Sequence, residues 1–155
     1  MSLGHTLHVT LDPLAGMVVV LAAPVGEDAA GDVTVRSLVP GAARDLLSRG
    51  AVLAVVTRDR LVRDEVERNA TLHEVDPPVA WSADPLDPET WARLYPHIEQ
   101  RLGPVDAVLA DPAAIDIVEE VFRPDMKRRG HGAIVGLSGP ADPVDQLRRH
   151  LQRRP

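Results

Sequence analysis

The sequence predicts a three-layer α/β fold in which helices cover both faces of a mostly parallel sheet of about five strands. Short β-branched runs alternate with longer segments of helical period, which is typical of a parallel sheet wrapped by helices. The strand-like runs are apolar almost throughout, as expected of strands that are buried on both faces. The chain has 155 residues, 45% of them hydrophobic, which is enough for one core. We therefore expect a single domain over residues 1–155.

Four of the expected strands are near-continuous apolar runs, and a fifth is shorter. In chain order they cover residues 17–23 (MVVVLAA), 51–57 (AVLAVVT), 79–83 (VAWSA), 106–110 (DAVLA) and 132–137 (GAIVGL). Within residues 1–16, the segment HTLHVTL alternates as a strand does, which predicts an additional strand at the N-terminal side of the sheet.

The segments between these strands have apolar residues at every third or fourth position, which predicts helices. The first two helices are expected at about residues 38–49 and 59–69. The third begins where Asp87 is placed to cap it and Pro88 occupies the first turn. Pro96 lies inside the third helix and lacks an N–H group, so we expect it to kink or split that helix.

Two further helices are predicted in the last third of the chain, each with one apolar side. The apolar side of the fourth helix is formed by Ile115, Val118, Phe122 and Met126, and that of the fifth by Val144, Leu147 and Leu151.

The composition argues against several classes of function. Seventeen Lys and Arg against 23 Asp and Glu give a net charge of -6, the wrong sign for a nucleic-acid or anionic-membrane partner. The absence of cysteine removes disulfides, thiolate zinc sites and cysteine nucleophiles, and favours the cytoplasm. The longest apolar stretch has less than half of the ~20 residues that a membrane-spanning helix needs, and no basic region precedes it. The six histidines are scattered, so no metal site is expected.

Four segments together cover most of residues 41–139: Leu46–Arg58 (LLSRGAVLAVVTR), Ala83–Trp91 (ADPLDPETW), Arg101–Leu109 (RLGPVDAVL) and Pro124–Ser138 (PDMKRRGHGAIVGLS). In this order they resemble the first crossover, the Asp-containing turn, the approach to the fourth strand and the Gly-x-Gly turn with the fifth strand of the short-chain dehydrogenases/reductases (SDRs). The resemblance implies a Rossmann-like fold. It also implies that the chain is C-terminally truncated, because the sixth and seventh strands of the family are missing.

The cofactor-binding residues of the family are mostly replaced. An SDR needs closely spaced glycines after its first strand, so that backbone N–H groups can approach the pyrophosphate. The corresponding loop, residues 26–32 (GEDAAGD), has two glycines and three carboxylates, Glu27, Asp28 and Asp32, which disfavour a phosphate. Residues 110–113 (ADPA) stand where the family has Asn-Asn-Ala-Gly.

The catalytic residues of the family are also replaced. SDRs use a Tyr as acid/base with a Lys four residues later, and a Ser after the fifth strand. Tyr95, the only tyrosine, is followed four residues later by Glu99, and the only lysine is Lys127. Ser138 stands one place before the catalytic position, which Gly139 occupies.

Two positions of the resemblance are retained. Arg58 matches the place where relatives contact the adenosine ribose or its 2′-phosphate, and Asp84 matches an adenine contact. Both residues also have a structural interpretation, Arg58 as an exposed cation at the start of a helix and Asp84 as a turn residue.

The resemblance leads to one preferred hypothesis and two alternatives. We expect a degenerate SDR-like pseudoenzyme that acts as a homo-oligomer or as a hetero-oligomer with an active SDR. In the family the fourth and fifth helices pack between subunits, so the partner interface is expected on the seven apolar side chains of these two helices. No cofactor is expected in this case. The alternatives are an NAD(P)-dependent oxidoreductase that holds its cofactor with Arg58 and Asp84, and a small-ligand-binding Rossmann module.

Overall fold

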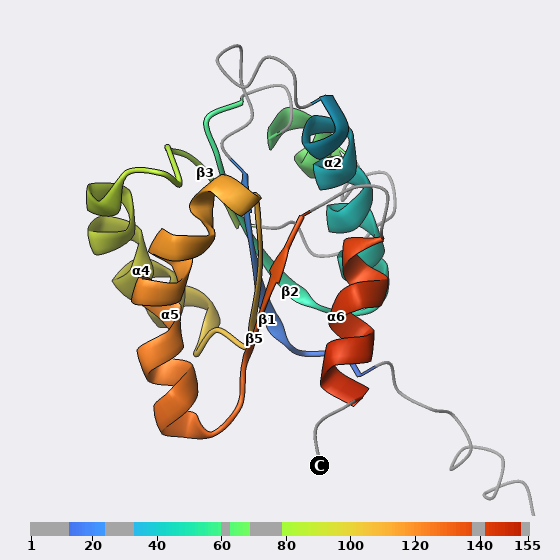
Figure 1. The fold of residues 1–155 in the computed structure, drawn as a ribbon. Helices are drawn as coiled ribbons and strands as arrows, with labels where there is room; N and C mark the ends of the chain where they lie inside the picture. The colour runs from blue at the N-terminus through green and yellow to red at the C-terminus, as the bar shows by residue number, and fades with distance from the viewer. Residues whose placement is uncertain (1–12, 24–32, 60–62, 69–78, 138–141, 153–155) are drawn as a thin grey trace, which may run out of the picture.

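The computed structural model describes residues 13–23, 33–59, 63–68, 79–137 and 142–152, and these have the predicted three-layer α/β architecture (Figure 1). All five strands are parallel, in the order β3-β2-β1-β4-β5. The strands are β1 (Val18–Ala23), β2 (Val52–Thr57), β3 (Val79–Ser82), β4 (Ala107–Ala110) and β5 (Ala133–Gly136). Their bounds confirm the predicted strands to within one residue.

Helices cover both faces of the sheet. They are α2 (Val33–Ser48), α4 (Pro88–Leu102), α5 (Ile115–Arg129) and α6 (Pro143–Gln152), with a 3-10 turn, η2 (Pro112–Ala114), before α5. In Figure 1, α4 and α5 lie on one side of the strands and α2 and α6 lie on the other. Residues 63–68 are also helical, which agrees with the predicted second helix where the structure describes it.

Two details of the helices differ from the prediction. Helix α2 begins at Val33, five residues before its predicted start. The prediction missed residues 33–37 (VTVRS) because they are weak helix formers with no clear apolar period. Helix α4 continues through Pro96 and is not split. The burial of Trp91, Leu94 and Ile98 on the sheet offsets the backbone hydrogen bond that the proline cannot make.

Two apolar clusters hold the layers together, one on each face of the sheet. Alternate β1 residues point to opposite faces, so Val19 and Leu21 join the cluster under α2 and α6, whereas Val18 and Val20 join the cluster under α4 and α5. The strands β1 and β4 are fully buried. This burial on both faces is the physical reason for their uninterrupted apolar sequences.

Strand β1 lies at the centre of the sheet, between β2 and β4. Asp106, directly before β4, accepts a hydrogen bond at 2.9 Å from the backbone N–H of Val18, 88 residues away. The start of β1 is thereby fixed to the start of β4.

The additional strand predicted within residues 1–16 lies mostly outside the described residues. None of the described helices is long and apolar enough to cross a lipid bilayer.

Candidate functional site

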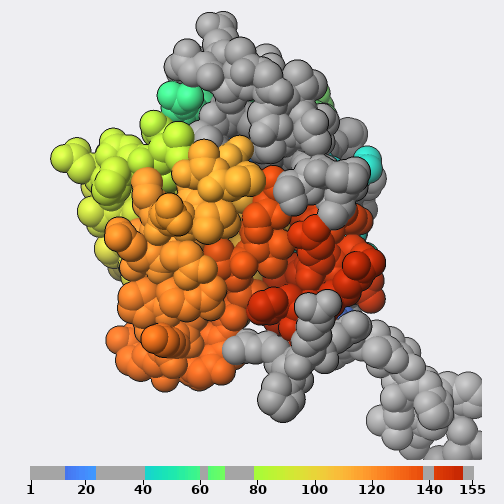
Figure 2. All heavy atoms as spheres, viewed as in Figure 1, coloured from blue at the N-terminus to red at the C-terminus, as the bar shows by residue number. Residues whose placement is uncertain are grey.

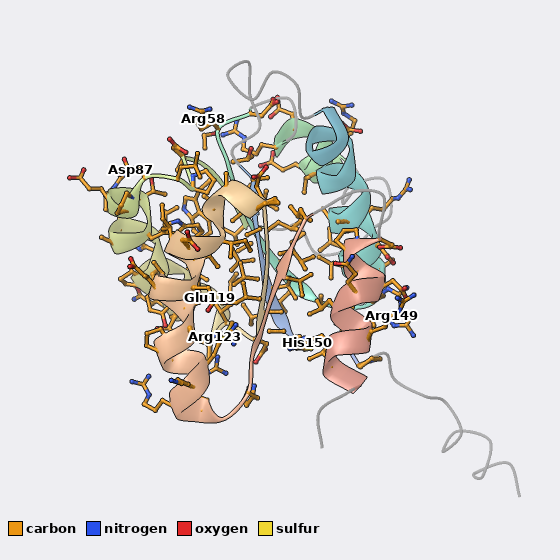
Figure 3. All side chains as sticks on the ribbon, in the orientation of Figure 1. Arg58, Asp87, Glu119, Arg123, Arg149 and His150 are labelled. Atoms are coloured by element: carbon orange, nitrogen blue, oxygen red, sulfur yellow. The ribbon has the colours of Figure 1, made fainter. Side chains whose placement is uncertain are left out.

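The candidate site lies at the carboxyl ends of β2 and β3. In an open parallel sheet, ligands bind outside the carboxyl ends of the strands, near the point where the strand order reverses. Here the order reverses between β1 and β4, because the chain proceeds from β1 outward to β3 on one side and from β4 outward to β5 on the other. The candidate site lies on the β1 side of this point. Figure 3 shows Arg58 and Asp87 at this end of the molecule.

The two retained positions of the sequence analysis are neighbours in the structure. A guanidinium nitrogen of Arg58 lies 4.0 Å from a carboxylate oxygen of Asp84, and about a third of each side chain is exposed (35% and 34%). Arg58 follows β2 directly, and Ala83 donates its N–H to the carbonyl oxygen of Thr57 at 3.0 Å, which aligns the two strand ends. The pairing partly neutralises the cation that a 2′-phosphate would need.

Asp84 also has the turn-forming role that was its structural interpretation. Its second carboxylate oxygen accepts a hydrogen bond from the N–H of Leu86 at 2.9 Å. Its carbonyl oxygen accepts the N–H of Asp87 at 3.1 Å, and the Asp87 side chain caps α4 by accepting the N–H of Glu89 at 3.0 Å. Asp84 therefore helps to build the turn that starts α4, whether or not it contacts a ligand.

A second arginine belongs to the same end of the sheet. Arg63 donates a hydrogen bond to the hydroxyl oxygen of Ser82, the last residue of β3. Its Nε is buried without a hydrogen-bond partner in the described structure. The sequence analysis did not identify Arg63. Arg63 follows Asp59 by four residues, and the carbonyl oxygen of Asp59 accepts the Arg63 N–H at 3.1 Å, but no pattern in the sequence indicates its contact with Ser82.

Carboxylates are interspersed with these cations. Asp59, directly after Arg58, is 6% exposed. Asp111, at the end of β4, caps η2 by accepting the N–H of Ala113 at 2.8 Å. The described part of the site is thus of mixed charge. Residues 26–32, with the three carboxylates of the first loop, and the Ser138 and Gly139 positions lie outside the described residues.

Solved structures of short-chain dehydrogenases/reductases share this architecture. A metagenomic short-chain oxidoreductase in complex with NADP superposes with a TM-score of 0.62 at 19% sequence identity, over 79% of this chain and 62% of that chain. A short-chain type dehydrogenase/reductase from Mycobacterium ulcerans superposes with a TM-score of 0.62 at 13% identity, over 79% of this chain and 51% of that chain. The chain has an SDR-like Rossmann fold.

NAD+-bound xylitol dehydrogenase is a third similar structure, with a TM-score of 0.59 at 13% identity over 86% of this chain and 59% of that chain. The chain therefore spans between 51% and 62% of the length of these three structures. No protein-family model and no curated protein matches the chain. At these identities the likeness shows the fold alone, and any chemistry has to be argued from the residues of this chain.

Tyr95 and Lys127, the one tyrosine and the one lysine of the sequence, do not form the Tyr-x-x-x-Lys pair that SDRs use. Tyr95 lies on α4, where its ring packs edge-on against Phe122 with centroids 5.2 Å apart. Burial, and then the nearby Glu99 carboxylate, raise the pKa of Tyr95 to about 12. Lys127 is in the last turn of α5, and because α5 runs antiparallel to the strands, this turn lies at the amino ends of the strands, opposite the candidate site.

The partner interface predicted on seven apolar residues of α5 and α6 stays a prediction, and within the described structure these side chains pack against the chain itself. Val118, Val144 and Leu147 are fully buried, Phe122 is 1% exposed and Met126 is 2% exposed. Ile115 and Leu151 are partly buried against the same two clusters. Apolar spacing identifies the buried side of a helix but does not distinguish the core of a subunit from a contact between subunits.

Proposed function

We propose that this chain is a non-catalytic SDR-like subunit that acts by association, either with a second copy or with an active relative. The observation that carries the proposal is the position of its one tyrosine and its one lysine. An SDR acid/base needs a tyrosine with a lowered pKa beside a lysine. Tyr95 has a raised pKa, and its helix neighbour is Glu99. We place this function in the cytoplasm, which the absence of cysteine favours.

Turnover measurements test the absence of chemistry. The purified chain is incubated with NADH or NADPH and a panel of ketones and aldehydes, and in the reverse direction with NAD+ or NADP+ and alcohols. We expect no nicotinamide oxidation or reduction above the rate without protein. Turnover that requires Tyr95, shown by its loss in Tyr95→Phe, contradicts the proposal.

Association is tested separately, by native mass spectrometry of the chain purified from its own cells at working concentration. We expect an oligomer or a complex with an active SDR. A strictly monomeric species with no co-purifying protein contradicts the proposal.

The second candidate is an NAD(P)-dependent oxidoreductase whose chemistry is supplied by a partner subunit. The proximity of Arg58 and Asp84 favours it, because both retained cofactor positions lie together at the strand ends. Calorimetric titration with NADPH distinguishes the candidates. Saturable binding at millimolar or tighter affinity that is lost in Arg58→Ala favours the second candidate, whereas the first predicts no saturable heat. Arg44→Ala, on α2, is the control for a general effect of removing an exposed arginine.

A further inference from the structure

Strand β5 is an edge of the described sheet, with one side free for pairing. On the other side the N–H groups of Ala133 and Leu137 donate to carbonyl oxygens on the β4 side at 3.1 and 2.7 Å. Bonding directions alternate along a parallel strand, so Ala133, Val135 and Leu137 bond toward β4. The N–H and C=O groups of Ile134 and Gly136 therefore point to the outer edge.

Within the residues that the structure describes, the outer edge of β5 has no charged side chain on the strand, no proline and no covering strand. Edge strands are commonly protected by charged side chains, by proline or by a covering element. The sequence of β5 is AIVG, and Ile134, Val135 and Gly136 are only half-buried. Figure 2 shows atoms of this segment at the surface between α5 and α6. At the opposite edge of the sheet, by contrast, the Arg63 side chain reaches the end of β3.

Helix α5, on one side of this edge, has charges of opposite sign in its two halves. Glu119 and Arg123 each directly follow a buried residue, and Figure 3 shows both on the side of the helix toward β5. The Arg123 guanidinium donates two hydrogen bonds to the Glu119 carboxylate, at 2.9 and 3.0 Å. The acidic residues of the first half are Asp116, Glu119 and Glu120, and the basic residues of the second half are Arg123, Lys127, Arg128 and Arg129, with Asp125 paired to the last two.

Helix α6, on the other side of the edge, has the same polarity. Asp145 is in its first turn, and Arg149 and His150 are in its last turn. Arg149 pairs with Asp145 at 2.7 Å, and both Arg149 and His150 are exposed. A shallow groove of about 310 Å³ between β5 and this helix is lined by Ile134, Val135, Gln146, Arg149 and His150.

We propose that β5 pairs antiparallel with β5 of a second copy of this chain, so that the two sheets become one continuous sheet. This inference rests on the proposed function, and it names the surface and the partner. A two-fold axis at Val135 sets Ile134 opposite the partner's Gly136 and Gly136 opposite the partner's Ile134. Each such pair exchanges two hydrogen bonds, so the edge forms four. The Val135 side chains of the two copies then meet across the axis, on the α6 side of the sheet.

The charges of the flanking helices favour a second copy over an unrelated strand. The two-fold axis that makes the β5 strands antiparallel also makes each α5 antiparallel to its copy. The acidic half of α5 then faces the basic half of the partner's α5, with Glu119 near the partner's Arg123. The same reversal brings Asp145 toward the partner's Arg149. A surface of this polarity is complementary to itself, as a two-fold interface requires.

Proline and alanine at one position give a matched test of the edge. A Cβ at Gly136 meets nothing within 4 Å, so the chain itself accommodates a side chain there. Gly136→Pro removes an N–H that points away from β4, and Gly136→Ala keeps it. We expect wild type and Gly136→Ala to sediment at twice 16.8 kDa, and Gly136→Pro to dimerise about tenfold or more weakly, because two of the four hydrogen bonds are lost. Far-ultraviolet circular dichroism and the unfolding midpoint confirm that each variant is folded.

A mixing experiment tests the helix contact without depending on proline. Glu119→Arg gives a copy with two arginines on the edge side of α5, and Arg123→Glu gives a copy with two glutamates. We expect each variant alone to dimerise more weakly than wild type, and an equimolar mixture to form a heterodimer. Both variants lose the same internal ion pair, so recovery in the mixture comes only from contacts between copies. A mixture that stays as weakly associated as its components overturns the proposed arrangement.

The remaining outcomes separate this inference from the proposed function. A wild type and a Gly136→Pro variant that dimerise equally overturn the β5 pairing but leave association intact. A monomer whose Ile134 and Gly136 amides are protected from hydrogen exchange shows that another segment of the chain covers the edge, which overturns the second copy as its occupant. A complex with a different protein that is lost in Gly136→Pro also overturns it. A monomer with exchanging edge amides and no partner overturns both proposals.

Discussion

The turn between α5 and β5 supports a quantitative prediction about Gly132. This residue has a φ of +147°, and a Cβ built on it lies 2.3 Å from Cγ and 2.5 Å from Sδ of Met126. Met126 is 2% exposed, so its side chain has little space into which to move. The backbone strain of Gly132→Ala costs about 1 to 3 kcal/mol, and the overpacking costs about 1 to 3 kcal/mol more. For a chain of this length the sum, about 2 to 6 kcal/mol, lowers the Tm by roughly 4 to 24 °C.

Gly136→Ala, four residues later at the end of β5, is the matched control, because its Cβ meets nothing within 4 Å and its φ is not positive. Thermal and urea unfolding followed by circular dichroism measure both variants. We expect Gly136→Ala to unfold within about 1 kcal/mol of wild type. In Gly132→Ala/Met126→Ala the clash is absent, so the two substitutions together should cost less than the sum of their separate effects. Equal stability of the two glycine variants, or strict additivity in the double variant, would refute this reasoning.

Three further predictions concern the helices α4 and α5. Asp87→Ala removes the cap of α4 and should lower the free energy of unfolding by about 1 kcal/mol, whereas Asp87→Asn should retain most of the stability in urea denaturation. The pKa of Tyr95 should be about 12 in the native protein and near its ordinary value of 10.0 in the unfolded chain, so the free energy of unfolding should fall as the pH rises between these two pKa values. An absorbance titration of the native and the urea-unfolded protein checks this, and Glu99→Gln should lower the native pKa. The hydrogen bonds from Arg123 lower the pKa of Glu119. Their contribution to the free energy of unfolding is therefore present at neutral pH and is lost as the pH falls through that lowered pKa. The loss of stability in acid, followed by urea denaturation, should be smaller in Glu119→Gln.

The strands and most helix positions could be predicted from the sequence because local features, namely capping residues and apolar runs, determine them. Asp87 accepts the N–H of Glu89 as predicted, and Asp142 accepts the N–H of Val144 at 3.0 Å at the start of α6. The apolar runs of β1 and β4 are buried on both faces, as their composition requires. Local hydrogen bonds and buried strands can therefore be predicted from the residue types and their spacing in the sequence.

The candidate site was predictable only in part, because its contacts join distant segments. Arg58 and Asp84 were identified one by one, but their ion pair depends on the neighbouring positions of β2 and β3. Arg63 reaches Ser82 across 19 residues, and no periodic signal indicates such a contact. The partner interface predicted on the apolar sides of α5 and α6 stays a prediction, because these sides are largely buried within the chain and a helix pattern does not distinguish a core from a contact between subunits. The sheet provides enough apolar surface to bury both sides within one chain, which a helix pattern alone does not reveal.

The central place of β1 has a consequence for biosynthesis. The second neighbour of β1 in the sheet is β4, and the hydrogen bond from Val18 to Asp106 spans 88 residues. A ribosome therefore releases an apolar strand with one unpaired edge, which stays unpaired until β4, 88 residues later, has been made. This takes about 4 to 18 s at usual elongation rates of ~5 to 20 residues per second. During that interval the nascent chain is exposed to misassembly, and holding chaperones would protect it most at this stage.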